Sequence, residues 1–228
     1  VLEKIIAEQK ERGAKISEDL DSSQYSWEEI DGELRLTGIN WDEKTLQGDI
    51  SFSGLSELKK LNCGSNNLFV PGLLTELDVR ENTKLESLAC SGNRLNKLDV
   101  SKNIKLKSLH CSMNQLTELD LSNNPELEYL YCNENKLTKL DVSRNMKIRQ
   151  LVCAGNGLTE LDTSNNIKLD YFDCTKNSLT ELDVSKNVKL YDLSCTSNEL
   201  QELDVSKNTE LSNLKCSSNE LLKLNVSN

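Results

Sequence analysis

Histidine, proline and aromatic side chains are scarce in this chain of 228 residues, which contains one histidine, two prolines and ten aromatic residues. Two prolines and ten glycines exclude collagen-like and mucin-like chains. No apolar run approaches the roughly 18 residues that a membrane-spanning helix needs. We therefore expect no membrane insertion.

The residues of a catalytic site are also missing. His110, the single histidine, precedes Cys111, but the alternation of a strand would place these two side chains on opposite faces. The sequence has no Ser/His/Asp set, no glycine-rich phosphate loop and no paired carboxylates in an expected cleft. We expect no enzyme activity, no catalytic residue and no cofactor.

Charge is unevenly distributed along the chain. The net charge is −10, of which −7 falls within residues 1–50 and −3 within the other 178 residues. Binding to nucleic acid, or to an anionic membrane surface, requires a basic stripe that replaces counterions. The sequence therefore predicts neither partner.

Leucine and asparagine are abundant, with 40 and 25 copies that make up more than a quarter of the chain. The eight cysteines lie at 63, 90, 111, 132, 153, 174, 195 and 216, so that each gap after Cys90 is 21 residues. A six-residue insertion around 69–72 explains the first gap of 27. The chain is therefore a repeat protein, and its hydrophobic content of 36% is enough for a sizeable core.

Each period contains two similar halves, L-x-x-L-x-C-x-x-N and L-x-x-L-D-V-S-x-N. The alternation within Leu-x-Cys and Leu-x-Val predicts a short strand in both halves, with little room for helix. Stacked coils would then form a right-handed, mainly β solenoid with short parallel strands on both faces and a leucine core. We refer to these faces as the L-x-C face and the L-D-V face.

This pattern resembles the leucine-rich repeat superfamily, most closely the irregular, nested 21-residue class of internalin-like secreted bacterial proteins. The resemblance covers roughly residues 46–228, or about eight coils. It implies a recognition scaffold, extracellular or on the cell surface, that binds another macromolecule through its strand face.

Residues 1–45 do not fit the repeat. Leu2, Ile5 and Ile6 have helical spacing, and Gly13 follows, which predicts a short amphipathic helix ending near Arg12. The segment 26–29 has the pattern of a capping box, and residues 34–41 alternate like strands. We interpret this region as an N-terminal cap over the exposed end of the solenoid.

Eight cysteines, an even number, could form disulfides between neighbouring coils. All eight, however, occupy the inward position that leucine or valine fills in the other half, which favours a ladder of buried free thiols. A zinc site is not expected, because a stacked column cannot supply a tetrahedron of ligands.

Two asparagine columns and one aspartate column also repeat. The asparagines are expected to point inward and to bond backbone groups where the chain turns. They lie at 66, 93, 114, 135, 156, 177, 198 and 219, and at 82, 103, 124, 145, 166, 187 and 208. The aspartates at 78, 99, 120, 141, 162, 183 and 204 form an outward column that Lys102, Arg144, Lys186 and Lys207 could neutralise. Calcium is not expected there, because the glycine-rich turns of calcium β-rolls are absent.

The two outer faces differ in variability. Outward residues of the L-D-V face repeat monotonously, whereas those of the L-x-C face differ in every coil. Where the fold alone dictates a residue, repeats should agree, so the variable face is free to specialise in binding. The candidate binding residues are Lys107, His110, Met113, Tyr129, Tyr131, Arg149, Val152, Tyr171, Asp173 and Tyr191. The alternative is an ordinary strand surface, because aromatic and β-branched residues suit exposed strands anyway.

The leading hypothesis is a non-enzymatic, secreted or cell-surface bacterial module that binds a protein through the L-x-C face, with a glycan as a weaker candidate. A structural spacer or stalk in a larger surface protein is the alternative, and a metal-dependent or enzymatic module ranks third. The last coil stops at Asn228 without a polar cap. We expect either a continuing chain or a dimer through residues 211–228.

Overall fold

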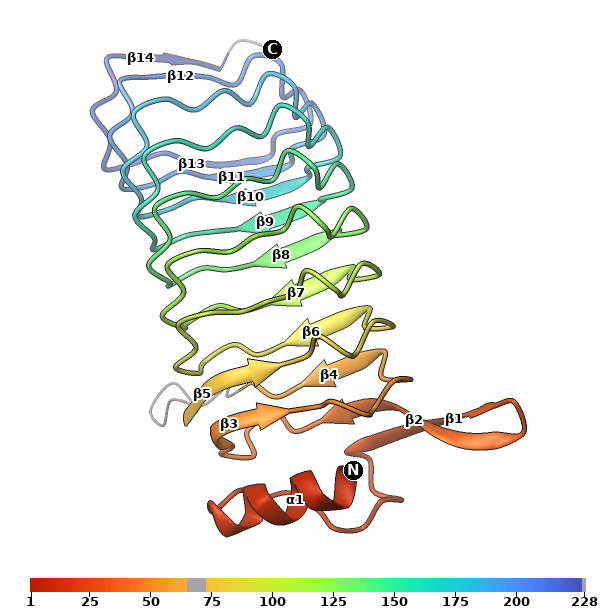
Figure 1. Ribbon diagram of the computed structural model, residues 1–228. Coiled ribbons are helices and arrows are strands. Elements are labelled where there is room, and N and C mark those ends of the chain that lie inside the picture. The colour runs from red at the N-terminus through yellow and green to blue at the C-terminus, as the bar shows by residue number, and fades with distance from the viewer. Residues whose placement is uncertain (65–72, 227–228) are drawn as a thin grey trace.

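The computed structural model is a right-handed solenoid whose coils stack into a rod, with the N-terminal segment at one end (Figure 1). The structure describes residues 1–64 and 73–226. Asn66 of the first asparagine column, the insertion expected at 69–72 and the terminal Asn228 lie outside the described residues. The fold predicted from the 21-residue period is confirmed.

The L-x-C face is a ten-stranded sheet in the order β1-β2-β4-β6-β7-β8-β9-β10-β11-β13. Its eight repeat strands are β4 (Lys60–Asn62), β6 (Ser87–Ala89), β7 (Ser108–His110), β8 (Tyr129–Tyr131), β9 (Gln150–Val152), β10 (Tyr171–Asp173), β11 (Asp192–Ser194) and β13 (Asn213–Lys215). All pair in parallel and in register. From β6 onward each residue lies beside its counterpart 21 positions along, as Leu109 lies beside Leu130, whereas between β4 and β6 the separation is 27. Equivalent residues of successive coils therefore form straight columns.

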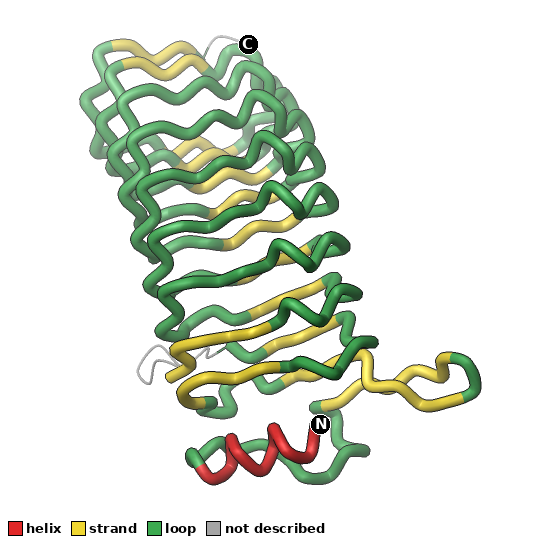
Figure 2. The backbone as a smooth tube through the Cα atoms, viewed as in Figure 1, coloured by secondary structure: helices red, strands yellow, loops and turns green. Residues whose placement is uncertain are grey.

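Among the described residues, the L-D-V face has regular strands only at its two ends (Figure 2). They are β3 (Gln47–Ser51) with β5 (Leu73–Asp78), and β12 (Glu202–Asp204) with β14 (Lys223–Asn225). In the coils between, a backbone amide such as that of Gln115 donates to the coil before it, at 2.8 Å from Leu95 O. Leu116 N bonds the Asn135 side chain at 3.0 Å. Backbone pairing on this face is thus sparser than on the L-x-C face.

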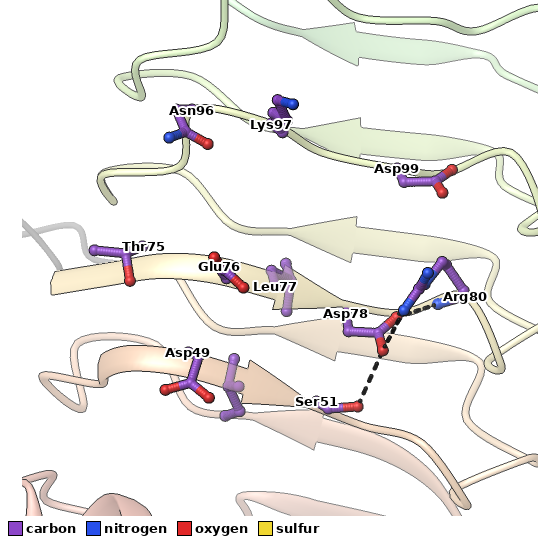
Figure 3. A pocket seen from close by; sticks show the side chains of 11 residues that line it. Asp49, Ser51, Thr75, Glu76, Leu77, Asp78, Arg80, Asn96, Lys97 and Asp99 are labelled. Atoms are coloured by element: carbon purple, nitrogen blue, oxygen red, sulfur yellow. Dashed lines mark hydrogen bonds and ion pairs between the residues drawn. The ribbon is translucent and has the colours of Figure 1, made fainter.

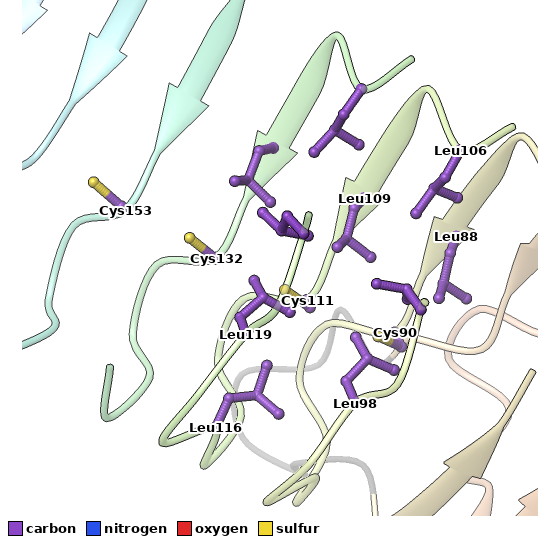
Figure 4. Close-up of a cluster of buried hydrophobic side chains, with 14 of the residues drawn as sticks. Leu88, Cys90, Leu98, Leu106, Leu109, Cys111, Leu116, Leu119, Cys132 and Cys153 are labelled. Carbon is purple, nitrogen blue, oxygen red and sulfur yellow. The ribbon is translucent and has the colours of Figure 1, made fainter. Parts of the chain in front are cut away.

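Leucine and cysteine side chains of both halves fill the space between the two faces (Figure 4). Leu88, Leu109 and Leu130 are completely buried. All eight cysteines are free thiols, seven of them buried and Cys216 half-buried. Burial raises the pKa of Cys90 and of Cys132 to about 12. The inward cysteine ladder is confirmed.

A thiol reagent should leave the seven buried cysteines of the native protein unmodified, and Cys216 should react first. The reason is that the thiolate is the reactive form, and burial disfavours it. After denaturation without prior reduction all eight thiols should react, as a spectrophotometric thiol titration would show. Fewer than eight would mean that disulfides join the coils.

The asparagine columns bond the backbone at both turns of each coil. In the column after the cysteines, Asn114 donates to Cys90 O and Cys111 O at 3.1 and 3.0 Å, and its Oδ1 accepts from Leu95 N at 3.0 Å. In the other column, Asn145 donates to Leu121 O and Asn124 O at 3.0 and 2.8 Å. Each side chain thereby ties its own coil to the preceding one, as the sequence predicted.

Thr163 stands at a position where the other described coils from Val79 onward have valine or leucine. Its buried hydroxyl bonds Asn187 Oδ1 at 3.0 Å. Within the described part of the chain, the Oδ1 atoms of the equivalent asparagines have no hydrogen-bond partner; they belong to Asn82, Asn103, Asn124, Asn145, Asn166 and Asn208. Thr163 therefore satisfies an acceptor that the other coils leave unpaired.

Thr163→Val should lower the free energy of unfolding by about 1 kcal/mol, because Asn187 Oδ1 loses its donor. The matched change Val142→Thr brings a hydroxyl to the same place beside Asn166 Oδ1, so stability should stay constant or rise. Urea denaturation of both variants measures the difference. An equal loss in both would show that the hydroxyl contributes nothing to this turn.

The N-terminal segment begins with α1 (Leu2–Glu11), which buries Leu2, Ile5 and Ile6 against the end of the solenoid. The helix ends at Arg12, and Gly13 follows with φ of 95°, a conformation that favours glycine. Gln9 fixes the helix to β3, since its side chain donates to Gln47 O and accepts from Gln47 N at 3.1 and 2.9 Å. The predicted helix is confirmed.

The capping box expected at 26–29 is wrong, because these residues lie in β1 (Tyr25–Ile30). This strand pairs with β2 (Glu33–Asn40) in an antiparallel hairpin, and β2 continues the L-x-C sheet by pairing with β4. Strand pairing with the sheet edge outweighs a short local motif. Completely buried Trp41 and Phe52 pack together behind this hairpin, with ring centroids 5.7 Å apart. The division at residue 45 stays a prediction.

Candidate binding surface

The candidate residues fall on the L-x-C sheet and at its borders. His110, Tyr129, Tyr131, Val152, Tyr171 and Asp173 lie within β7, β8, β9 and β10. Lys107, Arg149 and Tyr191 come just before β7, β9 and β11, whereas Met113 lies in the turn after β7. Because the strands are in register, most of these side chains share one outer surface across five coils.

Aromatic contacts connect neighbouring coils of this surface. His110 stacks on Tyr131, with ring centroids 4.4 Å apart and planes inclined by 25°. The Tyr131 hydroxyl hydrogen-bonds Gln150 on the next strand. Tyr171 and Tyr191 lie 6.4 Å apart in a tilted arrangement. Contacts of this kind hold rings in place, so they would lose little entropy on binding a partner.

The two basic candidate residues are paired with carboxylates of neighbouring coils. Lys107 binds Glu86 at 2.9 Å, and Arg149 donates to one oxygen of Asp170 through two nitrogens, at 2.9 and 2.8 Å. The hydrogen bond from Lys107 holds the pKa of Glu86 below its ordinary value. Both pairs link one coil to the next. Lys107 and Arg149 thus border the aromatic residues as fixed polar groups.

Met113 belongs to a different column from the other candidates. It is 41% exposed, its φ is 55°, and its amide donates to Asn133 O at 2.8 Å. Among the described residues, the same turn position has a positive φ at Gly92, Met113, Glu134, Gly155, Lys176, Ser197 and Ser218. Sequence reasoning missed this column, although two glycines in it were a signal. The structure therefore places Met113 on a turn beside the sheet, not on the strand surface.

A shallow hollow adjoins the aromatic residues on the same sheet. Its volume is about 460 Å³, and small residues form much of it, among them Gly64, Ser87, Ala89 and Ser91. His110 lines the hollow from the side of the aromatic residues. Sequence reasoning did not identify this hollow, although the short outward side chains in the coils before His110 indicate it. The L-x-C surface thus combines a raised aromatic area with an adjoining depression.

The L-D-V face also has shallow hollows, one of about 450 Å³ near its N-terminal end (Figure 3). Asp78 there binds Arg80 at 2.9 Å and bonds Ser51 at 3.4 Å. In the next coils each aspartate accepts the amide of the serine two residues on, at 3.0 Å for Asp99 and 2.9 Å for Asp120. Hydrogen bonds from the hydroxyl and the amide of Ser122 lower the pKa of Asp120. The aspartate column therefore stabilises turns through its carboxylates.

His110 and Cys111 point to opposite faces, as predicted, because Cys111 is completely buried while His110 is half-buried on the outer surface. Across residues 1–64 and 73–226, no group of three His, Cys, Asp or Glu side chains could hold a metal ion. The same residues include no helix with the length and apolarity to cross a membrane.

Burial lowers the pKa of His110 below its ordinary value of 6.5. The neutral ring is thus favoured in the folded state, so its contribution to stability is complete above about pH 6.5 and is lost as pH falls through the folded pKa. NMR titration of this single histidine should give a pKa below 6.5, and His110→Gln should remove that part of the pH dependence. A value of 6.5 or above would contradict the packing against Tyr131.

A family model described as "Leucine Rich repeats (2 copies)" matches residues 104–145, and the solenoid geometry agrees with it. The chain has the leucine-rich repeat fold. Its fold is similar to that of the internalin InlF from Listeria monocytogenes, with a TM-score of 0.64 and 19% identity. That match covers 86% of this leucine-rich repeat chain and 70% of the InlF chain.

The functional domain of InlJ, also from Listeria monocytogenes and described as including a cysteine ladder, is 32% identical with a TM-score of 0.46. The match covers 83% of this chain and 53% of that one, so the leucine-rich repeat chain spans about half the length of the InlJ structure. The ectodomain of the Arabidopsis thaliana receptor kinase GASSHO1/SCHENGEN3, solved with CASPARIAN STRIP INTEGRITY FACTOR 2, has a TM-score of 0.60 at 18% identity. This match covers 97% of this chain and 36% of the receptor ectodomain. No curated protein matches the chain.

Proposed function

We propose that this leucine-rich repeat protein is a non-enzymatic recognition module, secreted or displayed on a bacterial cell surface, that binds a protein partner through its L-x-C face. The observation that carries the proposal is the single outer surface built from different side chains of successive coils. His110, Tyr131, Tyr171 and Tyr191 are brought together there by the register of the strands. Tyrosine and arginine are enriched among the residues that dominate binding energy in protein interfaces.

The contrast with the L-D-V face supports this choice. Its repeated aspartates bond the backbone of their own turns, so the fold accounts for that column. No comparable structural task accounts for Tyr129 and Tyr171, whose counterparts in neighbouring strands are Ser108, Gln150 and Asp192. A position that tolerates serine, glutamine and aspartate does not require tyrosine for folding. Binding to a partner would explain why tyrosine is present at these two positions.

A protein fits this surface better than a glycan does. The surface extends across five coils, or roughly 19 Å along the rod at about 4.8 Å per coil, and it is wide and shallow rather than enclosed. Protein interfaces are similarly broad, with aromatic residues at the centre and paired charges at the rim. Residues 1–45 act in this proposal as a cap that covers one end of the core, and residues 46–228 supply the binding solenoid.

The proposal can be tested with arrays of purified extracellular protein domains and of glycans, probed with the full chain and two variants. Tyr129→Ala/Tyr131→Ala/Tyr171→Ala alters the L-x-C face, and Asp120→Asn/Asp141→Asn is the matched control on the other face. A protein that binds wild type and the control but loses the tyrosine variant supports the proposal. Binding of glycans alone would contradict a protein partner and favour a glycan, and binding of no component of either array would favour the alternative of a spacer.

A further inference from the structure

The edge of the solenoid where the L-D-V face turns into the L-x-C sheet presents a row of exposed aliphatic side chains. These turns stack along the right-hand side of the rod in Figure 1. Ile104, Met146, Ile167 and Val188 occupy the same position in their coils and are 56%, 61%, 57% and 47% exposed. Pro125 fills that position in the coil between Ile104 and Met146 and is also exposed. We call these five residues the aliphatic row.

The turn itself fixes where these side chains point. Each follows a completely buried asparagine, and the amide three residues after that asparagine closes the turn, as when Leu169 N donates to Asn166 O at 2.9 Å. The residue of the row lies inside this turn and cannot move into the core. Nothing in the repeat requires it to be apolar, because the same position is Ser56, Thr83 and Thr209 towards the ends of the solenoid. Five consecutive apolar residues at an exposed position are therefore unexplained by folding.

Basic residues flank the row on both sides. Lys102, Arg144 and Lys186 precede the buried asparagines, and Lys105, Lys147, Lys168 and Lys189 follow the row. Glu126 is the one acidic residue at these flanking positions within 102–189, and it binds Lys147 at 2.6 Å. In the described part of the chain, none of the other six basic residues takes part in a salt bridge. The edge is thus basic although the chain as a whole is acidic.

We propose that the aliphatic row and its basic flanks form a second interaction surface, which binds an acidic amphipathic helix of a partner protein. Coils repeat at about 4.8 Å and turns of an α-helix at about 5.4 Å, so apolar side chains on one helix stripe fall close to successive members of the row. Acidic residues beside that stripe would meet the lysines on either side. The surface lies on the edge of the solenoid and does not depend on the tyrosines of the L-x-C face.

Electrostatic repulsion disfavours two other partners for this edge, a second copy of the chain and an anionic membrane. In a symmetric dimer through this edge the two basic rows would face one another, which disfavours a second copy of the chain. A flat anionic bilayer would also contact the aspartate column, whose members lie four residues before each buried asparagine. Repulsion from these carboxylates and from the net charge of −10 disfavours binding to such a bilayer. A narrow helix contacts the basic rows without reaching that column.

The test measures binding of a labelled synthetic helical peptide of about 18 residues, with leucine along one stripe and glutamate on both sides, by fluorescence anisotropy with the full chain. The control peptide has lysine in place of each glutamate. We expect the glutamate peptide to bind at least about tenfold more tightly than the lysine peptide, with affinity that falls as salt rises. No binding of the glutamate peptide, or equal binding of both peptides, would overturn the proposal.

Two variants locate the site. Ile104→Ser/Met146→Ser/Ile167→Ser/Val188→Ser should weaken peptide binding at least about tenfold, and Lys105→Gln/Lys168→Gln/Lys189→Gln should weaken it and reduce its salt dependence. All seven positions are exposed, so both variants should keep the wild-type melting temperature. Tyr129→Ala/Tyr131→Ala/Tyr171→Ala should bind the peptide as wild type does. Unchanged affinity in the serine variant, or tighter binding to phosphatidylserine vesicles than to the peptide, would refute the proposed site.

Discussion

Asn145→Ala should lower the free energy of unfolding by about 1–3 kcal/mol, a substantial share of the stability of a domain this size. Asn145 is completely buried, and its amide nitrogen donates to Leu121 O and Asn124 O. Without the amide each carbonyl keeps only the backbone donor of its own turn, Asn124 N for Leu121 O and Leu127 N for Asn124 O. Each of the two lost hydrogen bonds is worth about 0.5–1.5 kcal/mol. Equilibrium urea denaturation followed by circular dichroism measures the loss.

Asn123→Ala is the matched control, because Asn123 is exposed in the equivalent turn of the preceding coil. Its effect should stay within about 0.5 kcal/mol. Equal stabilities for the two variants would show that the asparagine column does not hold the coils together.

The combined change Tyr129→Ala/Tyr131→Ala/Tyr171→Ala should weaken binding to the true partner by about 3 kcal/mol, or more than a hundredfold. Each ring is half-buried on the L-x-C face, where it can still contact a partner. Truncation of an interface hot spot costs more than about 1 kcal/mol, while truncation of an outward side chain leaves the core intact. Calorimetric titration gives the affinity, and the melting temperature should remain close to that of wild type.

Single variants refine this expectation. Tyr131→Ala also removes the stacking on His110 and the bond to Gln150, so it should cost more than Tyr129→Ala. Asp120→Asn/Asp141→Asn should leave affinity unchanged. A loss in that control as large as in the tyrosine variant would place the site on the L-D-V face.

The fold could be predicted from the sequence because each structural position recurs in many coils, with the same type of residue each time. The cysteine spacing identified the coil, and the alternation around Leu109 and Cys111 identified which side chains point inward. Asn114 and Asn145 were assigned to backbone bonding at the turns because a polar residue in an inward column needs partners. The structure confirms these assignments in coil after coil.

Features that occur once, or that depend on contacts between coils, could not be predicted in this way. The segment 26–29 matches a capping box by chance, and its true conformation is decided by pairing between β1 and β2. The hydroxyl of Thr163 has a role only because Asn187 lies beside it in the next coil. The net negative charge of the chain concealed the basic edge, since the basic residues beside Ile104, Met146, Ile167 and Val188 form rows only after the coils stack. The candidate site itself remains a prediction from variability, to which the structure adds the aromatic contacts and the hollow beside His110.

The central claim, that the L-x-C face binds the partner, is tested most directly by blocking one face at a time. In a Cys216→Ser background, which removes the half-buried native thiol, Ser108→Cys on β7 and Thr138→Cys on the L-D-V face each introduce an accessible thiol. A bulky maleimide-polyethylene glycol attached there covers the surrounding surface. Binding should be abolished when the group is attached at position 108 and retained when it is attached at position 138. Retention at 108 together with loss at 138 would contradict the account.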